Sequence, residues 1–193
     1  MKLKNVIIVV GLFVMALFSQ TLFADAISNW RTDAENNDDV AQCKLGLSYL
    51  YGLNNVETNI GEGVKWIRKA ANLGNAEAQY QLGMCYSSGT GVLKMPSEAV
   101  KWWYKSADQA HAGALYMMAV AYDCGYGGTK IDSLKASLLL EGAAKGGDER
   151  AQYQFGLRLY KANRQADAVF WLKLSAKQGE EDAKKLLQQI SEQ

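Results

Sequence analysis

The sequence predicts an all-α protein, a superhelical solenoid of about four two-helix repeats. An alanine returns at steps of 37, 36 and 37 residues, with a small residue five positions after it. A tyrosine or leucine follows eight positions after the alanine. Such a period is typical of solenoids, in which one unit cannot bury its apolar face alone. The three columns are Ala41, Ala78, Ala114 and Ala151; Gly46, Gly83, Ala119 and Gly156; and Tyr49, Tyr86, Tyr122 and Leu159.

A third observation marks the second helix of each repeat. A large apolar residue is followed eight positions later by glycine or alanine, and the last step shortens to 32 residues. Residues 161–166, before that last helix, contain no glycine, so we expect a tight turn there. The column is Trp66, Trp102, Leu139 and Trp171, followed by Gly74, Ala110, Gly147 and Gly179. The predicted solenoid domain, 39–193, contains repeats at 39–75, 76–111, 112–148 and 149–180.

Residues 1–24 have the layout of a secretory signal peptide. Lys2 and Lys4 precede an apolar run over 6–18, which is too short to span a membrane comfortably. Cleavage after Ala24 or after Ala26 fits the small-residue pattern, and no cysteine lies near either site to carry a lipid. We therefore expect a protein exported to a bacterial periplasm, or secreted, that is not integral to a membrane after cleavage.

Both ends of the solenoid are predicted to be capped. Residues 25–38 read as half a repeat, because Trp30 and Ala34 repeat the spacing of the large and small residues in the second helices. Terminal repeats are commonly degenerate, since one of their faces meets water. Residues 181–193 begin like a further first helix and then stop, so we expect a C-terminal capping helix.

We call the first helix of each repeat its A helix and the second its B helix. The A helix of the first repeat should run from Asp39 to Tyr51, capped by Asp38 or Asp39. The small residue of the Gly46 column leaves room where two helices cross closely. Glycines at the ends of three A helices are expected to have a positive φ: Gly52, Gly89 and Gly125. B helices are predicted at about 61–73, 97–109, 134–145 and 165–177.

The length and the charge of the mature chain indicate how many domains it has and which partners they do not favour. The mature chain of 169 residues suits one solenoid domain, which we expect to be a monomer. Removing the signal peptide leaves 19 basic and 20 acidic residues. Nothing in this total favours nucleic acid or an anionic membrane surface as a partner.

Three cysteines, Cys43, Cys85 and Cys124, would reach an oxidising compartment. Cys85 and Cys124 lie at similar positions in neighbouring repeats, so they are the candidate disulfide. The alternative, that all three are small buried apolar residues without any bond, stays equally open.

The repeat motif resembles a known family. The pattern A-x-Y-x-L-G-x-x-Y-x-x-G-x-G-V, followed by A-x-x-W-x-x-x-A-A-x-x-G, is similar to the Sel1-like repeat, a relative of the tetratricopeptide repeat. The second repeat departs from it only at Ser106 and Ala110, whereas the fourth lacks the glycine loop. The resemblance covers residues 39–183. It implies an α/α superhelix with a concave surface lined by A helices, in an adaptor or binder of proteins and peptides.

By analogy with the tetratricopeptide register, fixed offsets from the aligned alanines face the concave side. They include a column of phenols that would suit contacts with a peptide. The alternative is that these tyrosines only pack against neighbouring repeats. The predicted protein-binding residues are Leu47, Tyr51, Tyr80, Met84, Tyr116, Val120, Asp123, Tyr153, Leu157 and Tyr160.

Trp103 lies one position beyond the repeated tryptophan, beside Tyr104. It could be exposed at an edge, where a large aromatic side chain would mark contact with a partner. Partial burial against the next repeat is the other interpretation.

The sequence offers no catalytic, metal-binding or cofactor-binding motif, so we expect a protein that is not an enzyme. His111 is the only histidine, which excludes a cluster of imidazoles around a metal. No serine has a lysine three residues later, as serine β-lactamases require, and G-x-S-x-G is absent.

These observations favour a non-enzymatic scaffold that binds another protein or peptide in the periplasm or cell envelope. Two alternatives remain from the family resemblance. One is a periplasmic immunity protein that neutralises a delivered toxin, and the other is a cell-wall or β-lactam hydrolase of the cysteine-rich Sel1-like type.

Overall fold

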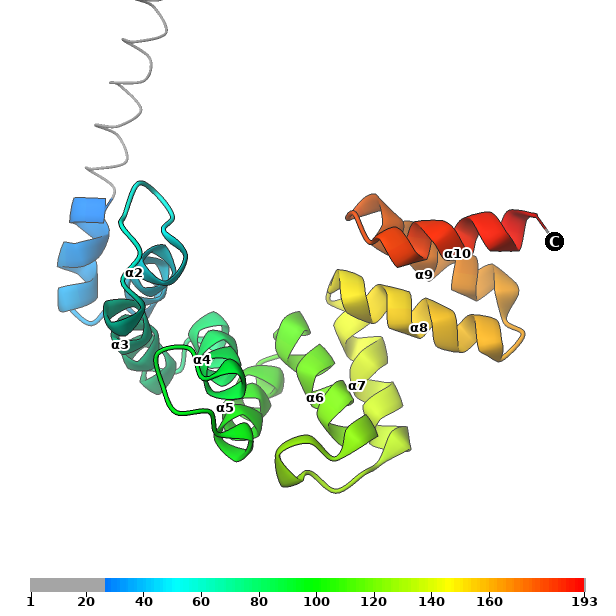
Figure 1. Cartoon of the computed structure of the whole chain (residues 1–193), viewed down its shortest axis with the longest axis horizontal. Coiled ribbons are helices and arrows are strands. Elements are labelled where there is room, and N and C mark those ends of the chain that lie inside the picture. The colour runs from blue at the N-terminus through cyan, green and yellow to red at the C-terminus, as the bar shows by residue number, and fades with distance from the viewer. Residues whose placement is uncertain (1–26, 193) are drawn as a thin grey trace, which may run out of the picture. The chain divides into compact units, whose positions relative to one another are not determined.

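The computed structural model describes residues 27–192, and every regular element in that range is helical (Figure 1). The proposed signal peptide, with both cleavage sites, lies outside the described residues. Contacts divide the chain into two units, Met1–Ala78 and Gln79–Gln193. Beyond the helical residues 27–35, the elements are α2 (Asp39–Tyr51), α3 (Ile60–Asn72), α4 (Ala76–Ser88), α5 (Pro96–Asp108), α6 (Ala112–Cys124), η1 (Tyr126–Gly128), α7 (Ser133–Lys145), α8 (Glu149–Lys161), α9 (Gln165–Lys177) and α10 (Glu181–Ser191).

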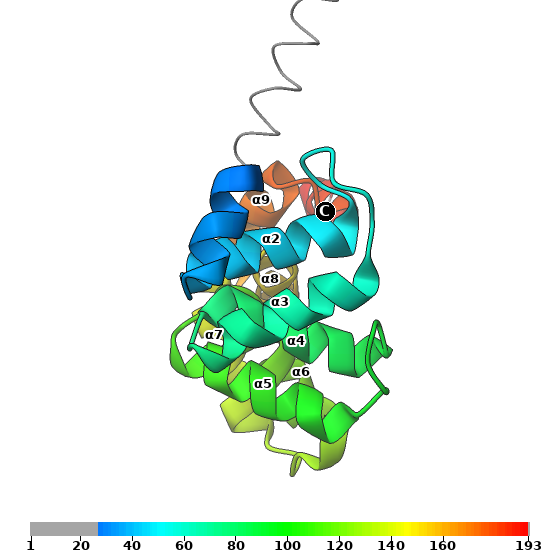
Figure 2. The same ribbon diagram turned by 90° about the vertical axis from the view of Figure 1, so that its left-hand side faces the viewer.

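The first unit is a helical hairpin with an additional N-terminal helix. Helices α2 and α3 pack against each other, and residues 27–35, in blue in Figure 2, lie against α2. The core contains Ala34, which is 1 % exposed, together with Leu45 and Trp66. Buried Gln42 donates a hydrogen bond of 2.9 Å to the carbonyl of Ala34. The predicted half-repeat therefore contributes a buried alanine and a backbone acceptor to the first full repeat.

The second unit continues the alternation of A and B helices. Helices α6 and α7 form one hairpin, and α8 and α9 form the next. Between successive hairpins α5 packs on α6, α7 on α8, and α9 on α10. The C-terminal segment thus forms the expected last helix, α10, which packs on α9. The A helix of the first repeat and the four B helices begin and end within one residue of their predicted bounds.

The small-residue column makes room for one large side chain from the B helix. A Cβ atom added at Gly46 would lie 2.7 Å from Cγ1 of Ile67, and one at Gly156 would lie 2.9 Å from Cγ of Leu172. At Gly83 an added Cβ would overlap the indole ring of Trp103. Glycine at these positions therefore admits a side chain that fills the hairpin.

Trp103 is not an exposed edge residue; it is 1 % exposed and is the largest fully buried side chain described. The residues that fill the hairpins lie one position beyond the aligned tryptophan column. In α5 this residue is Trp103. It shares one face of the helix with Ala99, four residues before it, and Ser106, three residues after it. The exposed aromatic residue of this segment is Tyr104, at 56 % exposure.

One column of polar residues caps the A helices. Each side chain accepts a hydrogen bond from the backbone N–H three residues later, at 2.7–3.2 Å. His111, the only histidine, belongs to this column, and its Nδ1 accepts from the N–H of Ala114 at 3.2 Å. The column is Asp38, Asn75, His111 and Asp148.

The ends of the helices follow the predicted turn chemistry. Gly52 and Gly125 end α2 and α6 in the left-handed region, with φ of 66° and 74°. In the fourth repeat, the connection from α8 to α9 is the expected tight turn. There Asn163 has a φ of 58° and replaces glycine in the left-handed region.

No disulfide joins any two of the three cysteines, so the suggested bond between Cys85 and Cys124 is not formed. Cys43 and Cys85 are buried on their A helices, whereas Cys124 is exposed at the end of α6. Burial raises the pKa of the Cys43 thiol to about 12, and Glu77 and Asp39 add to the effect. Cys43 is therefore a protonated, unreactive thiol at neutral pH.

This difference predicts the alkylation pattern of the folded protein. Iodoacetamide at pH 8 should label Cys124 alone, because only its sulfur meets solvent. Mass spectrometry of the native protein should show one added group, and denaturant should raise the number to three. Rapid native labelling of Cys43 or Cys85 would contradict the packing of these A helices.

Candidate functional site: a tyrosine–arginine cluster on the A helices

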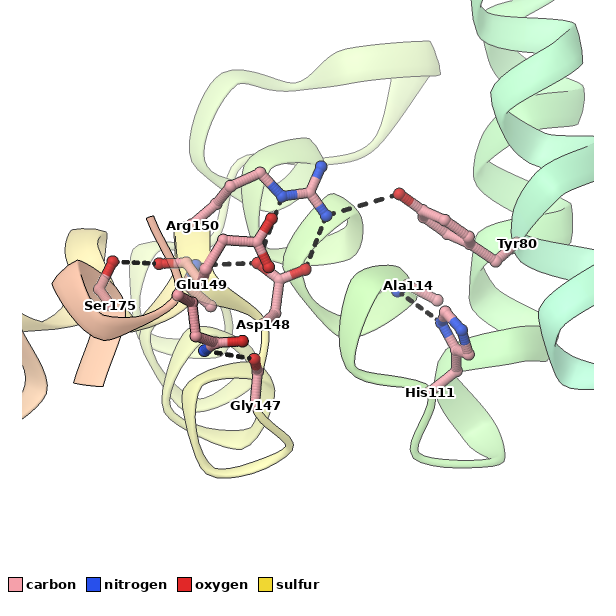
Figure 3. Close-up of polar contacts among 10 residues, drawn as sticks. Tyr80, His111, Ala114, Gly147, Asp148, Glu149, Arg150 and Ser175 are labelled. Carbon is pink, nitrogen blue, oxygen red and sulfur yellow. Dashed lines mark hydrogen bonds and ion pairs between the residues drawn. The ribbon is translucent and has the colours of Figure 1, made fainter. Parts of the chain in front are cut away.

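The predicted binding residues divide between the two units. Leu47 and Tyr51 lie on α2 in the first unit, where Tyr51 is 58 % exposed. The other predicted residues lie on the A helices of the second unit. Within that unit Tyr80 and Tyr116 converge on Arg150, and these residues, with Asp148, form what we call the tyrosine–arginine cluster. Figure 3 shows its members Tyr80, Arg150 and Asp148.

Tyr80 is held in place by the start of the next A helix. Its ring stacks on the imidazole of His111, with centroids 4.9 Å apart and an angle of 29° between the planes. A Cβ atom added at Gly113 would lie 3.1 Å from Cζ of Tyr80. Gly113 therefore provides the space that the phenol ring occupies, and the Tyr80 ring is half-buried in a defined position.

Arg150 connects three successive A helices. Its Nη2 donates to Oδ2 of Asp148 at 2.6 Å, and its Nε donates to Oδ1 at 3.3 Å. The same Nη2 lies 3.5 Å from the hydroxyl of Tyr80 on α4. The guanidinium carbon lies 4.6 Å from the ring centroid of Tyr116 on α6. One cation thus contacts a phenol hydroxyl and an aromatic face, and a buried carboxylate fixes its orientation.

The electrostatics of the cluster keep Arg150 charged and Tyr116 protonated. Burial lowers the pKa of Arg150, but hydrogen bonds to Asp148 and Tyr80 and the charge of Asp148 outweigh this effect and raise the pKa overall. Burial raises the pKa of Tyr116 above its ordinary value, although the charge of Arg150 opposes the shift. At neutral pH the cluster therefore presents the neutral phenol of Tyr116 beside one paired cation.

Asp148 has two structural tasks, which explains its burial. Its side chain is 5 % exposed, and Oδ1 accepts a hydrogen bond of 2.9 Å from the backbone N–H of Ala151. It also holds Arg150, which lies in the first turn of α8, where a positive charge is unfavourable to the helix dipole. The ion pair offsets that cost and orients the guanidinium group.

A second ion pair lies on the same helices, toward their C-terminal ends. Arg158 on α8 pairs with Asp123 on α6 and donates a hydrogen bond of 2.9 Å to Ser137 of α7. Asp123 was predicted as a binding residue, and its carboxylate contacts Arg158 at about one-third exposure. This pair links the third repeat to the fourth.

The remaining predicted residues are distributed around the cluster. Met84 packs against the buried group of Ala99, Trp103 and Met118, so its main contacts are with the core. Tyr153 lies on α8 near Lys185 of α10. Half-buried side chains complete the set: Val120, Leu157 and Tyr160.

Arg150 and Asp148 were missed by the sequence reasoning. Asp148 could have been found, because it occupies the periodic capping column. Arg150 stands at a position where the other repeats have Val40, Glu77 and Gly113, so no period marks it. The sequence shows its charge, whereas its aromatic neighbours come from two other repeats.

The protein-family model of the Sel1 repeat matches four segments of the chain: residues 39–75, 76–111, 112–148 and 151–180. The chain belongs to the Sel1 repeat family. This match confirms the predicted family and the predicted solenoid of two-helix repeats. The tyrosine–arginine cluster thus lies on the A helices of the second, third and fourth Sel1 repeats.

Solved structures and one curated protein are similar to this chain. A Sel1 repeat protein from Oxalobacter formigenes is 33 % identical, with a TM-score of 0.74, over 86 % of this chain and 69 % of that one. The immunity protein Pa5087 from Pseudomonas aeruginosa shares the fold, at 17 % identity and a TM-score of 0.58, over 81 % of this chain and 59 % of that one. The F-box protein At1g70590 of Arabidopsis thaliana is 38 % identical over 64 residues, 33 % of this chain. The chain spans only 17 % of that curated relative.

Two features are absent from the part of the chain that the structure describes. Among residues 27–192, no group of three or more His, Cys, Asp or Glu side chains is arranged to hold a metal ion. In the same range, no helix combines the length and the apolar character needed to cross a bilayer.

Proposed function

We propose that this protein is a non-enzymatic scaffold that binds another protein or a peptide through the A helices of its second unit. The observation that carries the proposal is the tyrosine–arginine cluster, in which Tyr80, Tyr116 and Arg150 come from three successive repeats. An extended partner segment that follows the repeats would meet all three side chains. Membership of the Sel1 repeat family supports the proposal.

The physical state of these side chains suits binding. Tyr80 and Tyr116 are half-buried, so each still offers part of its ring surface to a partner. Their neighbours already hold them: His111 stacks on Tyr80, and Arg150 lies over Tyr116. Binding therefore costs little further side-chain entropy, and aromatic and arginine side chains are the residues that most often dominate interface energies.

Truncation of the two phenols tests the proposal. Replacing Tyr80 and Tyr116 together by alanine should weaken partner binding on the order of 100-fold, because each should contribute about 1.4 kcal/mol. The measurement is a pull-down from the native cell with mass spectrometry, followed by titration of the retained partner. Lys173→Ala on α9 is the control, because its side chain is exposed on a B helix. Equal loss in both proteins would refute binding through the A helices.

The identity of the retained partner also decides between roles. A toxin with its active site blocked would make the protein an immunity protein, whereas an envelope component would make it an adaptor. Hydrolysis of a chromogenic β-lactam that survives purification and disappears in a point variant would overturn the non-enzymatic assignment.

We further propose that the protein acts in the periplasm after export. The support is the sequence of residues 1–24, in which Lys2 and Lys4 precede an apolar run and alanine stands at the candidate cleavage sites. N-terminal sequencing of the protein from a periplasmic extract should begin at Asp25 or Ile27. Recovery of the intact N-terminus from the cytoplasm would overturn the assignment.

A further inference from the structure

A second surface is formed by α5, α6 and the loop between α6 and α7. It is a groove of about 430 Å³ whose wall includes Trp102 and Tyr104 from α5 and Tyr122 from α6. Buried Met118 contributes to it, and Thr129 from the loop completes one end. An adjoining cavity of about 180 Å³ shares Tyr104, Met118 and Tyr122 and extends toward Leu139 of α7. The larger groove falls within the usual volume range of small-molecule sites, roughly 300–1,000 Å³.

The surface of this groove is largely apolar and remains uncovered in the second unit. Tyr104 is 56 % exposed, although it adjoins Met118, which is 2 % exposed. Three aromatic side chains around one depression exceed the scattered apolar exposure that is normal on a protein surface. The groove can therefore receive an apolar body.

The ammonium groups of two lysines lie over aromatic rings of the groove. Nζ of Lys105 lies 4.1 Å from the ring centroid of Trp102, and Nζ of Lys135 lies 4.4 Å from that of Tyr122. A hydrogen bond to Tyr122 raises the pKa of Lys135, so this group is cationic. Neither lysine has a carboxylate within ion-pair distance anywhere in residues 27–192.

The acidic groups near the groove do not pair with these two lysines. Glu98 is already paired with Lys101 at 2.6 Å. Asp132 accepts the backbone N–H of Lys135 as the cap of α7. Asp108 lines the adjoining cavity, and neither its carboxylate nor that of Asp132 forms an ion pair with Lys105 or Lys135. Two ammonium groups without an ion-pair partner among residues 27–192, beside an apolar groove, thus favour an anion that carries an apolar body.

We infer that this groove binds a small amphipathic carboxylate, with its acyl or aryl body against Tyr104, Met118 and Tyr122 and its carboxylate at Lys105 and Lys135. Tyr80, Tyr116 and Arg150 do not line the groove. The inference is therefore independent of the proposed partner binding, and either can fail without the other.

Titration by nuclear magnetic resonance tests the inference with three probes that share one apolar chain: octanoate, octanol and octylamine. Octanoate should shift the Trp102 indole signal and the Lys105 and Lys135 signals saturably, and octylamine should bind at least about tenfold more weakly. Equal binding of octanoate and octylamine would overturn the inference, because it would show apolar adhesion alone. The absence of a saturable shift with octanoate would overturn it too.

Two pairs of substitutions separate local charge from net charge. The variant Lys105→Gln with Lys135→Gln should lose about five- to tenfold in octanoate affinity, as expected for two exposed charge contacts. Lys173→Gln with Lys177→Gln makes the same change of charge on α9 and should keep the native affinity. All four lysines are exposed, so both variants should retain the native spectrum. Equal losses in the two variants would contradict the assigned groove.

Discussion

Replacing Trp103 by alanine should lower the free energy of unfolding by about 3–5 kcal/mol, the usual cost of removing a buried aromatic side chain. Trp103 is 1 % exposed and fills the space above Gly83, so nothing else in the hairpin can take its place. Its Nε1 has no hydrogen-bond partner among the described residues. The contribution of Trp103 therefore comes from the burial of its ring.

Trp102→Ala is the matched control for this prediction. Trp102 is only partly buried, with Lys105 over its ring, so its loss should cost about 1 kcal/mol. Urea denaturation followed by circular dichroism measures both variants. If the Trp102 variant were the less stable of the two, the assignment of the hairpin core would be wrong.

Replacing Gly83 by alanine should destabilise the protein by about 1–3 kcal/mol, because overpacking forces side chains and backbone apart. The added Cβ would overlap the Trp103 ring and lie 3.1 Å from the carbonyl of Ala99. The backbone contact limits how far the hairpin can adjust. The loss should appear as a lower midpoint of urea denaturation with an unchanged slope.

The third repeat supplies a rescue for this variant. There the small residue is Ala119, and the buried residue of the B helix in the same cluster is Leu140. Gly83→Ala combined with Trp103→Leu reproduces this pair, so it should be more stable than the sum of the two single losses predicts. Gly142→Ala is the control. Its added Cβ would contact only Leu115, at 3.6 Å, so this variant should be more stable than the native protein by about 0.5–1 kcal/mol. If the stability losses of the two single variants simply added in the double variant, Gly83 and Trp103 would not share one space.

The periodicity predicted the helices well because the features that set them are local. Gly52 and Gly125 end their helices, and Asp38 caps α2, through contacts within a few residues. The burial of the Trp103 side chain was harder to predict. Two adjacent tryptophans in α5 differ by about 100° around the helix, so a small error in helical phase exchanges their surroundings.

The candidate site was predicted in part for a similar reason. Tyr80 and Tyr116 repeat with the solenoid, so their column could be read from the sequence. Arg150 has no equivalent in the other repeats, and its contact with Tyr80 joins residues 70 positions apart. Contacts of this kind depend on the packing of whole repeats, which spacing along the chain does not give.

Site-specific photocrosslinking in the native cell tests most directly whether the A helices bind the partner. A photoreactive phenylalanine at Tyr153 on α8, or at Phe170 on α9, places the same probe on the A and B helices of the fourth repeat. Phe170 is 57 % exposed, so its probe would report any partner near the B helices. We expect one discrete protein adduct from position 153, lost when Tyr80 and Tyr116 are replaced by alanine. An adduct formed equally from position 170, or one that survives those replacements, would contradict binding through the tyrosine–arginine cluster.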